Sequence, residues 1–246
     1  MMVLMFVFRY NYTKYYGVMS VENRNYAIVL FSGGLDSTTT LAIAKSMNFN
    51  IIALTINYEQ RHISEVDASK LILNDYPDVQ HIIFNVDLNK IGGSALTDPE
   101  IDIPNNLSED IPITYVPARN TIFLSIAAAY AERFEVRDIF IGVNAIDYSG
   151  YPDCRPEFIN SFESMINLGT KSGVTGKKIT IHAPLVKMKK YEIIKSGVEH
   201  GVDYSKTLSC YNPSDDGLAC NACDACHYRK EGFRIAGIDD PTKYKK

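Results

Sequence analysis

The sequence lacks an excess of positive charge, a long apolar run, and any repeat or low-complexity tract. Its 246 residues carry a formal net charge of −4, which argues against a broad basic face for duplex nucleic acid. The apolar start, residues 1–8, is far shorter than the roughly 20 residues that a membrane span requires. No basic segment precedes it and no small-residue cleavage site follows, so we expect no secretory signal. We predict a cytoplasmic protein without membrane contact, in which residues 1–23 form a dispensable extension.

A disulfide framework is also missing. The sequence contains five cysteines, an odd number, and four of them lie between positions 210 and 226. Such clustering is typical of a metal site in a reducing compartment. The four are Cys210, Cys220, Cys223 and Cys226. Their short spacers match a closed tetrahedral zinc site, and we predict one structural zinc ion.

Two other metal centres fit part of this pattern. An iron–sulfur cluster would also use four thiolates, although nothing else in the sequence calls for electron transfer. The segment from Cys223 to His227 matches a haem-attachment pattern, but that interpretation requires export and leaves Cys210 and Cys220 unused. We expect His227 to lie on a helix surface and not to bind the metal.

Apolar runs alternate with helical patterns along the chain. Strands are predicted at residues 26–31, 51–58, 81–86, 138–143 and 179–182. Helices are predicted at residues 37–47, 65–76, 119–134, 157–167 and 189–200, and residues 89–113 read as a long irregular stretch. Strands that alternate with helices predict an α/β fold with a doubly wound parallel sheet. Ligands bind beyond the carboxyl ends of the strands in such sheets.

The segment from Phe31 to Ser37, with the sequence FSGGLDS, joins the first strand to the first helix. Two glycines let successive backbone N–H groups point inward, and the helix start adds a positive dipole end, so the segment suits a phosphate chain. We expect Gly34 in particular to need backbone freedom and room for a phosphate. The simpler alternative is a Gly-Gly turn with serine and aspartate as helix caps.

Neither a Walker A loop nor a dinucleotide fingerprint is present. The S-G-G-x-D-S pattern instead resembles the pyrophosphate loop of the ATP pyrophosphatase superfamily. Three further strings narrow the resemblance: YEQRH at 58–62, VPARN at 116–120 and GVNAIDYSGYPDCRPE at 142–157. With the loop and the cysteine spacing, they make the chain from about Tyr26 onward similar to the 7-cyano-7-deazaguanine synthase family.

This resemblance implies an adenine nucleotide α-hydrolase-like fold and a defined reaction. A 7-carboxy-7-deazaguanine, ammonia and ATP would give the nitrile through an adenylated acid and an adenylated amide, releasing AMP and diphosphate for queuosine or archaeosine biosynthesis. It also implies Mg²⁺ with the ATP, a homodimer and no direct nucleic-acid partner. We divide the chain into the extension, an ATP-binding domain at 24–206 and a zinc-binding C-terminal subdomain at 207–246, packed on the same domain.

The candidate site residues fall into three groups. Asp36 and Arg119 are expected to be catalytic, Arg119 because its planar fork can hold a phosphate or carboxylate. The residues expected to bind ATP are Phe31, Ser32, Gly33, Gly34, Leu35, Asp36, Ser37, Thr38, Thr39, Thr40, Leu41 and Arg61, with Lys190 as a further phosphate candidate. The residues expected to bind the deazaguanine are Asn144, Asp147, Tyr148, Tyr151, Asp153 and Arg155.

These assignments rest on side-chain chemistry, and each has a structural alternative. Carboxylates can accept from the base edge and tyrosines can stack on the ring, but both also serve in turns and packing. Cys154 can act as a nucleophile; ATP activation makes a covalent intermediate unnecessary, so we expect a contact role.

Two other functions compete. A related adenylating enzyme of the tRNA-thiolating or lysidine-forming type should show a basic appended domain or a catalytic cysteine pair. A non-enzymatic nucleotide-gated zinc module should not turn over ATP.

Overall fold

The computed structural model describes residues 25–58, 64–98, 100–104, 111–145, 150–214 and 216–246. Its sheet has five parallel strands in the order β3-β2-β1-β4-β5. The strands are β1 (Tyr26–Leu30), β2 (Asn50–Asn57), β3 (Gln80–Asn85), β4 (Asp138–Phe140) and β5 (Thr180–His182). The order reverses between β1 and β4, so the predicted doubly wound parallel sheet is confirmed.

Helices lie between the strands and after β5, as the alternating pattern predicts. They are α1 (Leu35–Ser46), α2 (Ser64–Leu73), α3 (Arg119–Phe134), α4 (Pro156–Gly169), α5 (Lys171–Val174), α6 (Lys190–Glu199) and α7 (Asp224–Ala236), with short 3-10 turns η1 (Pro152–Cys154) and η2 (Tyr204–Lys206). The described part of residues 89–113 contains no helix or strand, as expected.

The fourth strand is shorter than predicted. We expected residues 138–143, but β4 ends at Phe140. Just beyond it, a side chain on Gly142 would place its Cβ 2.9 Å from the Thr40 hydroxyl and 3.1 Å from the Asp36 carbonyl oxygen. The chain therefore leaves the sheet where it must pass close to the start of α1.

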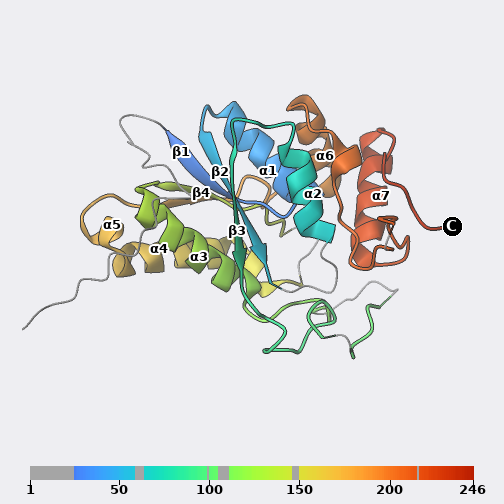
Figure 1. The fold of residues 1–246 in the computed structure, drawn as a ribbon, viewed down its shortest axis with the longest axis horizontal. Coiled ribbons are helices and arrows are strands. Elements are labelled where there is room, and N and C mark those ends of the chain that lie inside the picture. Colours follow the sequence, from blue (N-terminus) through green and yellow to red (C-terminus); the bar gives the residue numbers. More distant parts are fainter. Residues whose placement is uncertain (1–24, 59–63, 99, 105–110, 146–149, 215) are drawn as a thin grey trace, which may run out of the picture.

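Alternate residues of the central strand face two different cores. Ile28 packs in one cluster with Leu124 of α3 and Phe162 of α4, whereas Val29 packs with Leu41 of α1 in a second cluster. Figure 1 shows the corresponding layers, with α3 and α4 on one side of the sheet and α1 and α2 on the other. This period-2 alternation is expected for a strand covered on both faces.

A third cluster attaches the C-terminal helices to α1. It joins Leu35 and Ala42 of α1 to Ile193 of α6 and Phe233 of α7. In Figure 1, α6 and α7 lie next to each other at the end of the molecule opposite α5. The chain around the cysteines thereby comes to lie near the first turn of α1. No helix in the described part of the chain combines the length and apolar character needed to cross a membrane.

Candidate functional site

Residues 32–37 form a tight turn after β1 together with the first residues of α1, and hydroxyls of the segment itself brace it; we call it the phosphate loop. The Ser32 N–H donates to the Ser37 hydroxyl at 3.2 Å, and the Gly34 N–H donates to the Ser32 hydroxyl at 3.3 Å. Ser37 in turn donates to the Gly34 carbonyl oxygen at 3.1 Å. The loop is therefore shaped before any ligand binds.

The glycine that needs backbone freedom is Gly33, and our expectation for Gly34 is wrong on this point. Gly33 has a φ of +81°, and an added Cβ would lie 2.6 Å from the backbone nitrogen of Ser69. Gly34 has a φ of −78°, which any residue can adopt. Gly33 therefore serves the turn and its packing on α2, while Gly34 faces the ligand space.

A cavity of about 240 Å³ lies beyond the carboxyl ends of β1, β2 and β4. At the start of the chain its wall is formed by Phe31, Ser32, Gly34, Leu35, Asp36 and Ser37. From the middle of the chain the lining includes Tyr58, Arg119, Asn120, Phe123, Asn144, Tyr151 and Cys154. The C-terminal part of the chain contributes Lys190, Leu208, Ser209, Tyr211, Ala225 and Arg229. The cavity lies where a doubly wound sheet is expected to bind its ligand.

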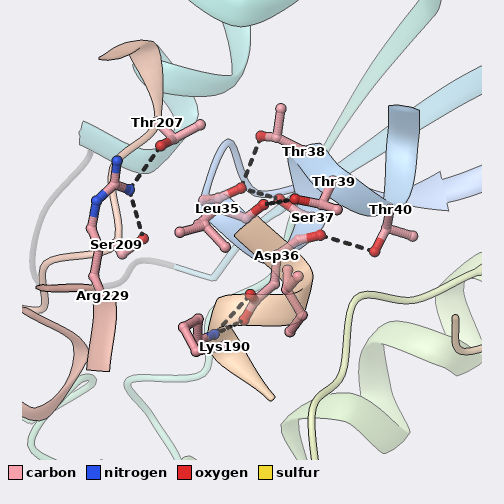
Figure 2. Close-up of polar contacts among 12 residues, drawn as sticks. Leu35, Asp36, Ser37, Thr38, Thr39, Thr40, Lys190, Thr207, Ser209 and Arg229 are labelled. Atoms are coloured by element: carbon pink, nitrogen blue, oxygen red, sulfur yellow. Dashed lines mark hydrogen bonds and ion pairs between the residues drawn. The ribbon is translucent and has the colours of Figure 1, made fainter. Parts of the chain in front are cut away.

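Besides Gly33, four residues predicted to bind ATP do not line this cavity: Thr38, Thr39, Thr40 and Leu41. The hydroxyls of residues 38 and 40 donate to backbone carbonyl oxygens one turn earlier, at 2.8 and 2.9 Å (Figure 2). Thr39 bonds to the Tyr204 hydroxyl at 2.7 Å, and Leu41 is fully buried in the core. The geometry gives these side chains a role in fixing the start of α1, in place of the predicted contact with ATP.

Asp36 and Lys190 form a close ion pair beside the phosphate loop. The Lys190 Nζ lies 2.8 Å from both Asp36 carboxylate oxygens, as Figure 2 shows. Only 9% of the lysine side chain is exposed. Lys190, the further phosphate candidate of the sequence, thus brings a positive charge from the first turn of α6 to the phosphate loop.

Arg119 also lines the cavity, from the first position of α3. The groups that interact with its guanidinium include the phenols of Tyr58 and Tyr151 and the thiol of Cys154. Within the described part of the chain no carboxylate forms an ion pair with Arg119, so the guanidinium is suited to hold an anionic ligand group.

Cys154 is a poor nucleophile in this environment. Burial raises the pKa of its thiol to about 12, although the nearby Arg119 charge acts in the opposite direction. The Asn120 side-chain amide also lies 3.4 Å from the Cys154 sulfur. A thiol with this pKa stays protonated at neutral pH, which favours the contact role.

Two residues predicted to bind the deazaguanine point elsewhere. Asp153 is 6% exposed, and its Oδ2 accepts from the backbone N–H of Asn120 at 2.9 Å. It therefore caps the start of α3 and is absent from the cavity wall. Arg155 is exposed at the N-cap of α4. The geometry thus gives Asp153 a capping role in place of the predicted contact with the base.

The other predicted contacts divide between the cavity and undescribed segments. Asn144 and Tyr151 line the cavity, and the Tyr151 hydroxyl lies 2.9 Å from the Thr114 hydroxyl oxygen. Arg61, Asp147 and Tyr148 lie outside the described residues.

The four clustered cysteines converge. Their sulfur atoms all lie within 4.8 Å of one another, and those of Cys220 and Cys226 are 3.9 Å apart. Thiolates at about 2.3 Å from a zinc ion in tetrahedral geometry would lie roughly 3.8 Å from each other. Backbone N–H groups already point at the sulfurs, as at Cys210, which accepts from Cys220 at 3.1 Å. The four residues can therefore hold a metal ion, and His227 is exposed outside the set.

The cysteine segment also supplies part of the cavity wall, which the sequence-based prediction missed. Tyr211 directly follows Cys210, and its hydroxyl lies 3.4 Å from that of Tyr151. Arg229 lies one helical turn after Cys226 and lines the same cavity. The sequence offers one signal for both residues, which is that each lies close to a metal ligand. A bound metal fixes the backbone of neighbouring residues, so such residues can be held in place at a site.

Comparison with known proteins identifies the family. The family model described as "Queuosine biosynthesis protein QueC" matches residues 26–237. A 7-cyano-7-deazaguanine synthase from Citrifermentans bemidjiense is 56% identical over 221 residues, covering 89% of this chain and 98% of the relative. The Pseudomonas putida F1 protein of the same name is 54% identical over 218 residues, covering 89% and 97%.

Among solved structures, NMN synthetase from Francisella tularensis matches 88% of this chain and 79% of its own, with a TM-score of 0.48 and 13% identity. That likeness is too weak to carry an argument. The sequence comparisons are strong enough to decide the family. The family model and relatives that are more than half identical match the chain along most of its length, so the chain belongs to the QueC family of queuosine biosynthesis proteins.

Proposed function

We propose that this protein converts 7-carboxy-7-deazaguanine and ammonia into 7-cyano-7-deazaguanine, with ATP cleaved to AMP and diphosphate. The names of its relatives support this reaction. The structural observation that carries the proposal is one cavity that is lined by the phosphate loop, by Arg119 and by several aromatic side chains.

The chemistry requires two activations of one carbon. A carboxylate is a poor acceptor for ammonia, so adenylation first turns one oxygen into a good leaving group. Ammonia then gives an amide, and a second adenylation allows the remaining oxygen to leave as the nitrile forms. Because the sequence contains no second nucleotide motif, both activations use the same phosphate loop.

The residues of the cavity would act by positioning charge. The N–H groups of the phosphate loop and the α1 dipole would hold the departing diphosphate. The Lys190 ammonium would stabilise negative charge beside the loop, and Arg119 would orient the substrate carboxylate or the α-phosphate. A pre-formed set of donors that need not reorganise is an efficient way to stabilise such charge.

The cofactors follow from the same sites. We propose that the four cysteines hold one zinc ion, whose binding contributes directly to the folding free energy of residues 207–246. Mg²⁺ would accompany the phosphates of ATP. We further propose a cytoplasmic homodimer that acts on small molecules, with residues 24–206 binding ATP and residues 207–246 packed on the same domain.

Mass spectrometry of a reaction containing 7-carboxy-7-deazaguanine, ammonium and MgATP tests this function. We expect the nitrile, AMP and diphosphate from the native chain. Arg119→Gln should abolish nitrile formation, while Arg133→Gln, a change to an exposed arginine of the same helix, should not. Absence of the nitrile with folded, metal-loaded native protein would contradict the proposal.

A further inference from the structure

Arg229 is a charged side chain buried next to the metal ligands. It is 2% exposed and lies on α7, which begins directly after Cys223 and contains Cys226 in its first turn. Two of the four cysteines therefore fix the start of the helix that carries it. A buried guanidinium is costly unless it is paired and hydrogen-bonded, so its partners show what it is placed to hold.

The partners of Arg229 divide into two sides. Its Nε donates to Asp240 at 3.1 Å, which neutralises the charge from within the C-terminal region. Its Nη1 donates to the hydroxyls of Thr207 at 2.8 Å and Ser209 at 3.4 Å, and its Nη2 donates to the Tyr204 carbonyl oxygen at 3.0 Å. Figure 2 shows the side chain directed at Thr207 and Ser209, beside the phosphate loop. Residues 204–209, here called the bracing segment, are thus held at three points by one side chain.

The bracing segment is in turn attached to the phosphate loop and to α1. The Leu208 N–H donates to the Gly33 carbonyl oxygen at 3.3 Å. The Tyr204 hydroxyl lies 2.7 Å from the Thr39 hydroxyl oxygen. Leu208 and Ser209 also form part of the cavity wall. A shift of this segment would therefore move the loop backbone that is suited to bind phosphate.

We propose that Arg229 is a positioning residue that couples the four-cysteine metal site to the phosphate loop, so that bound metal and bound nucleotide strengthen each other. The path runs from Cys226 through α7 to Arg229, and from there through the bracing segment to Gly33. This inference rests on nucleotide binding at the loop, as proposed above. Coupling between two binding affinities is reciprocal. If metal strengthens nucleotide binding, nucleotide must therefore strengthen metal binding, and we expect this gain to appear as slower metal release.

Two measurements on the metal-loaded full chain test this coupling. Calorimetry gives the affinity for MgATP, and transfer of metal to a chromogenic chelator gives the release rate with and without MgATP. Arg229→Gln should weaken MgATP binding by at least about fivefold, the lower end of ordinary coupling, and should remove the slowing of metal release by MgATP. Arg234→Gln is the matched control, because Arg234 lies on the same helix, is 71% exposed and pairs with Glu231. It should behave as the native chain in both measurements.

A second variant keeps the test decisive if Arg229→Gln does not fold. The double change Thr207→Val and Ser209→Ala removes two acceptors on the bracing segment and leaves the pair between Arg229 and Asp240 intact. It should reproduce the loss of coupling while metal stays bound. A merely structural Arg229 would leave the effect of MgATP on metal release unchanged.

The outcomes separate this inference from the proposed function. If the native chain binds MgATP but releases metal at the same rate with or without it, the coupling is refuted and the function stands. If the double variant keeps native coupling, the coupling path is likewise refuted and the function is unaffected. If the native chain binds no MgATP, both the function and the coupling fail.

Discussion

Gly33→Ala should destabilise the fold, because the backbone and the space at this position both exclude a side chain. The φ of +81° costs an L-residue about 1–2 kcal/mol. The new Cβ would also lie 2.6 Å from the Ser69 nitrogen and 3.0 Å from its Cα, an overpacking that typically costs about 1–3 kcal/mol. Together these effects predict a loss of about 2–5 kcal/mol in the free energy of unfolding. That is a large share of the roughly 5–15 kcal/mol typical of a native protein.

Gly34→Ala is the matched control one residue along. Its φ is −78°, and its Cβ would make only ordinary contact, 3.4 Å from the Leu208 carbonyl oxygen and the Ser32 hydroxyl. The free energy of unfolding should change by less than about 1 kcal/mol. MgATP binding should weaken, because Gly34 is part of the cavity wall.

Equilibrium unfolding in urea measures the difference between the two variants. The sequence contains no tryptophan, so far-ultraviolet circular dichroism is the suitable probe. Calorimetry with MgATP completes the comparison. Equal unfolding midpoints for the two variants, or a Gly33→Ala variant as stable as the native chain, would refute the reasoning.

Three further changes probe the site and its support. Lys190→Met should lower AMP formation by at least about 100-fold, the usual effect of removing a donor that stabilises developing charge, whereas Lys195→Met on the exposed side of the same helix should not. Cys154→Ser should keep turnover within about tenfold of native between pH 6 and 9, because the native thiol, with its pKa of about 12, is already protonated; a larger loss would favour covalent catalysis. Burial pushes the pKa of Asp240 upward, but the hydrogen bond from Tyr244 and the charge of Arg229 outweigh it and lower the pKa below 3.8. The resulting stability is present above the unfolded pKa of about 3.9 and is lost as the pH falls through the folded pKa. Asp240→Asn should therefore lower the Tm at pH 7, with the difference from the native chain shrinking below about pH 4; an unchanged difference would contradict this linkage.

The elements that depend on local sequence were predictable. Residues close together in the chain determine the apolar run of β1, the Gly-Gly turn and the start of α1. The short spacers between the four cysteines likewise predict that their sulfur atoms converge. The end of β4 was not predictable in this way. It depends on how closely Gly142 approaches Asp36, a contact between distant segments.

The polar partners of the site show the same limit. Lys190 reaches Asp36 from 154 residues away, so no spacing pattern reveals the pair. From its sequence neighbours Asp153 is predicted to contact the base, but its carboxylate caps the start of α3. Gly33 and Gly34 are identical letters, and only the packing of α2 against the loop decides which one needs a positive φ. Side-chain roles of this kind are fixed by tertiary neighbours.

The number of AMP molecules formed per nitrile tests most directly the proposal that one phosphate loop activates the substrate twice. Starting from 7-carboxy-7-deazaguanine, ammonium and MgATP, we expect two AMP and two diphosphate for each nitrile. Starting from synthetic 7-amido-7-deazaguanine without ammonium, we expect one of each. Formation of ADP, or failure to convert the amide by protein that converts the acid, would contradict the account.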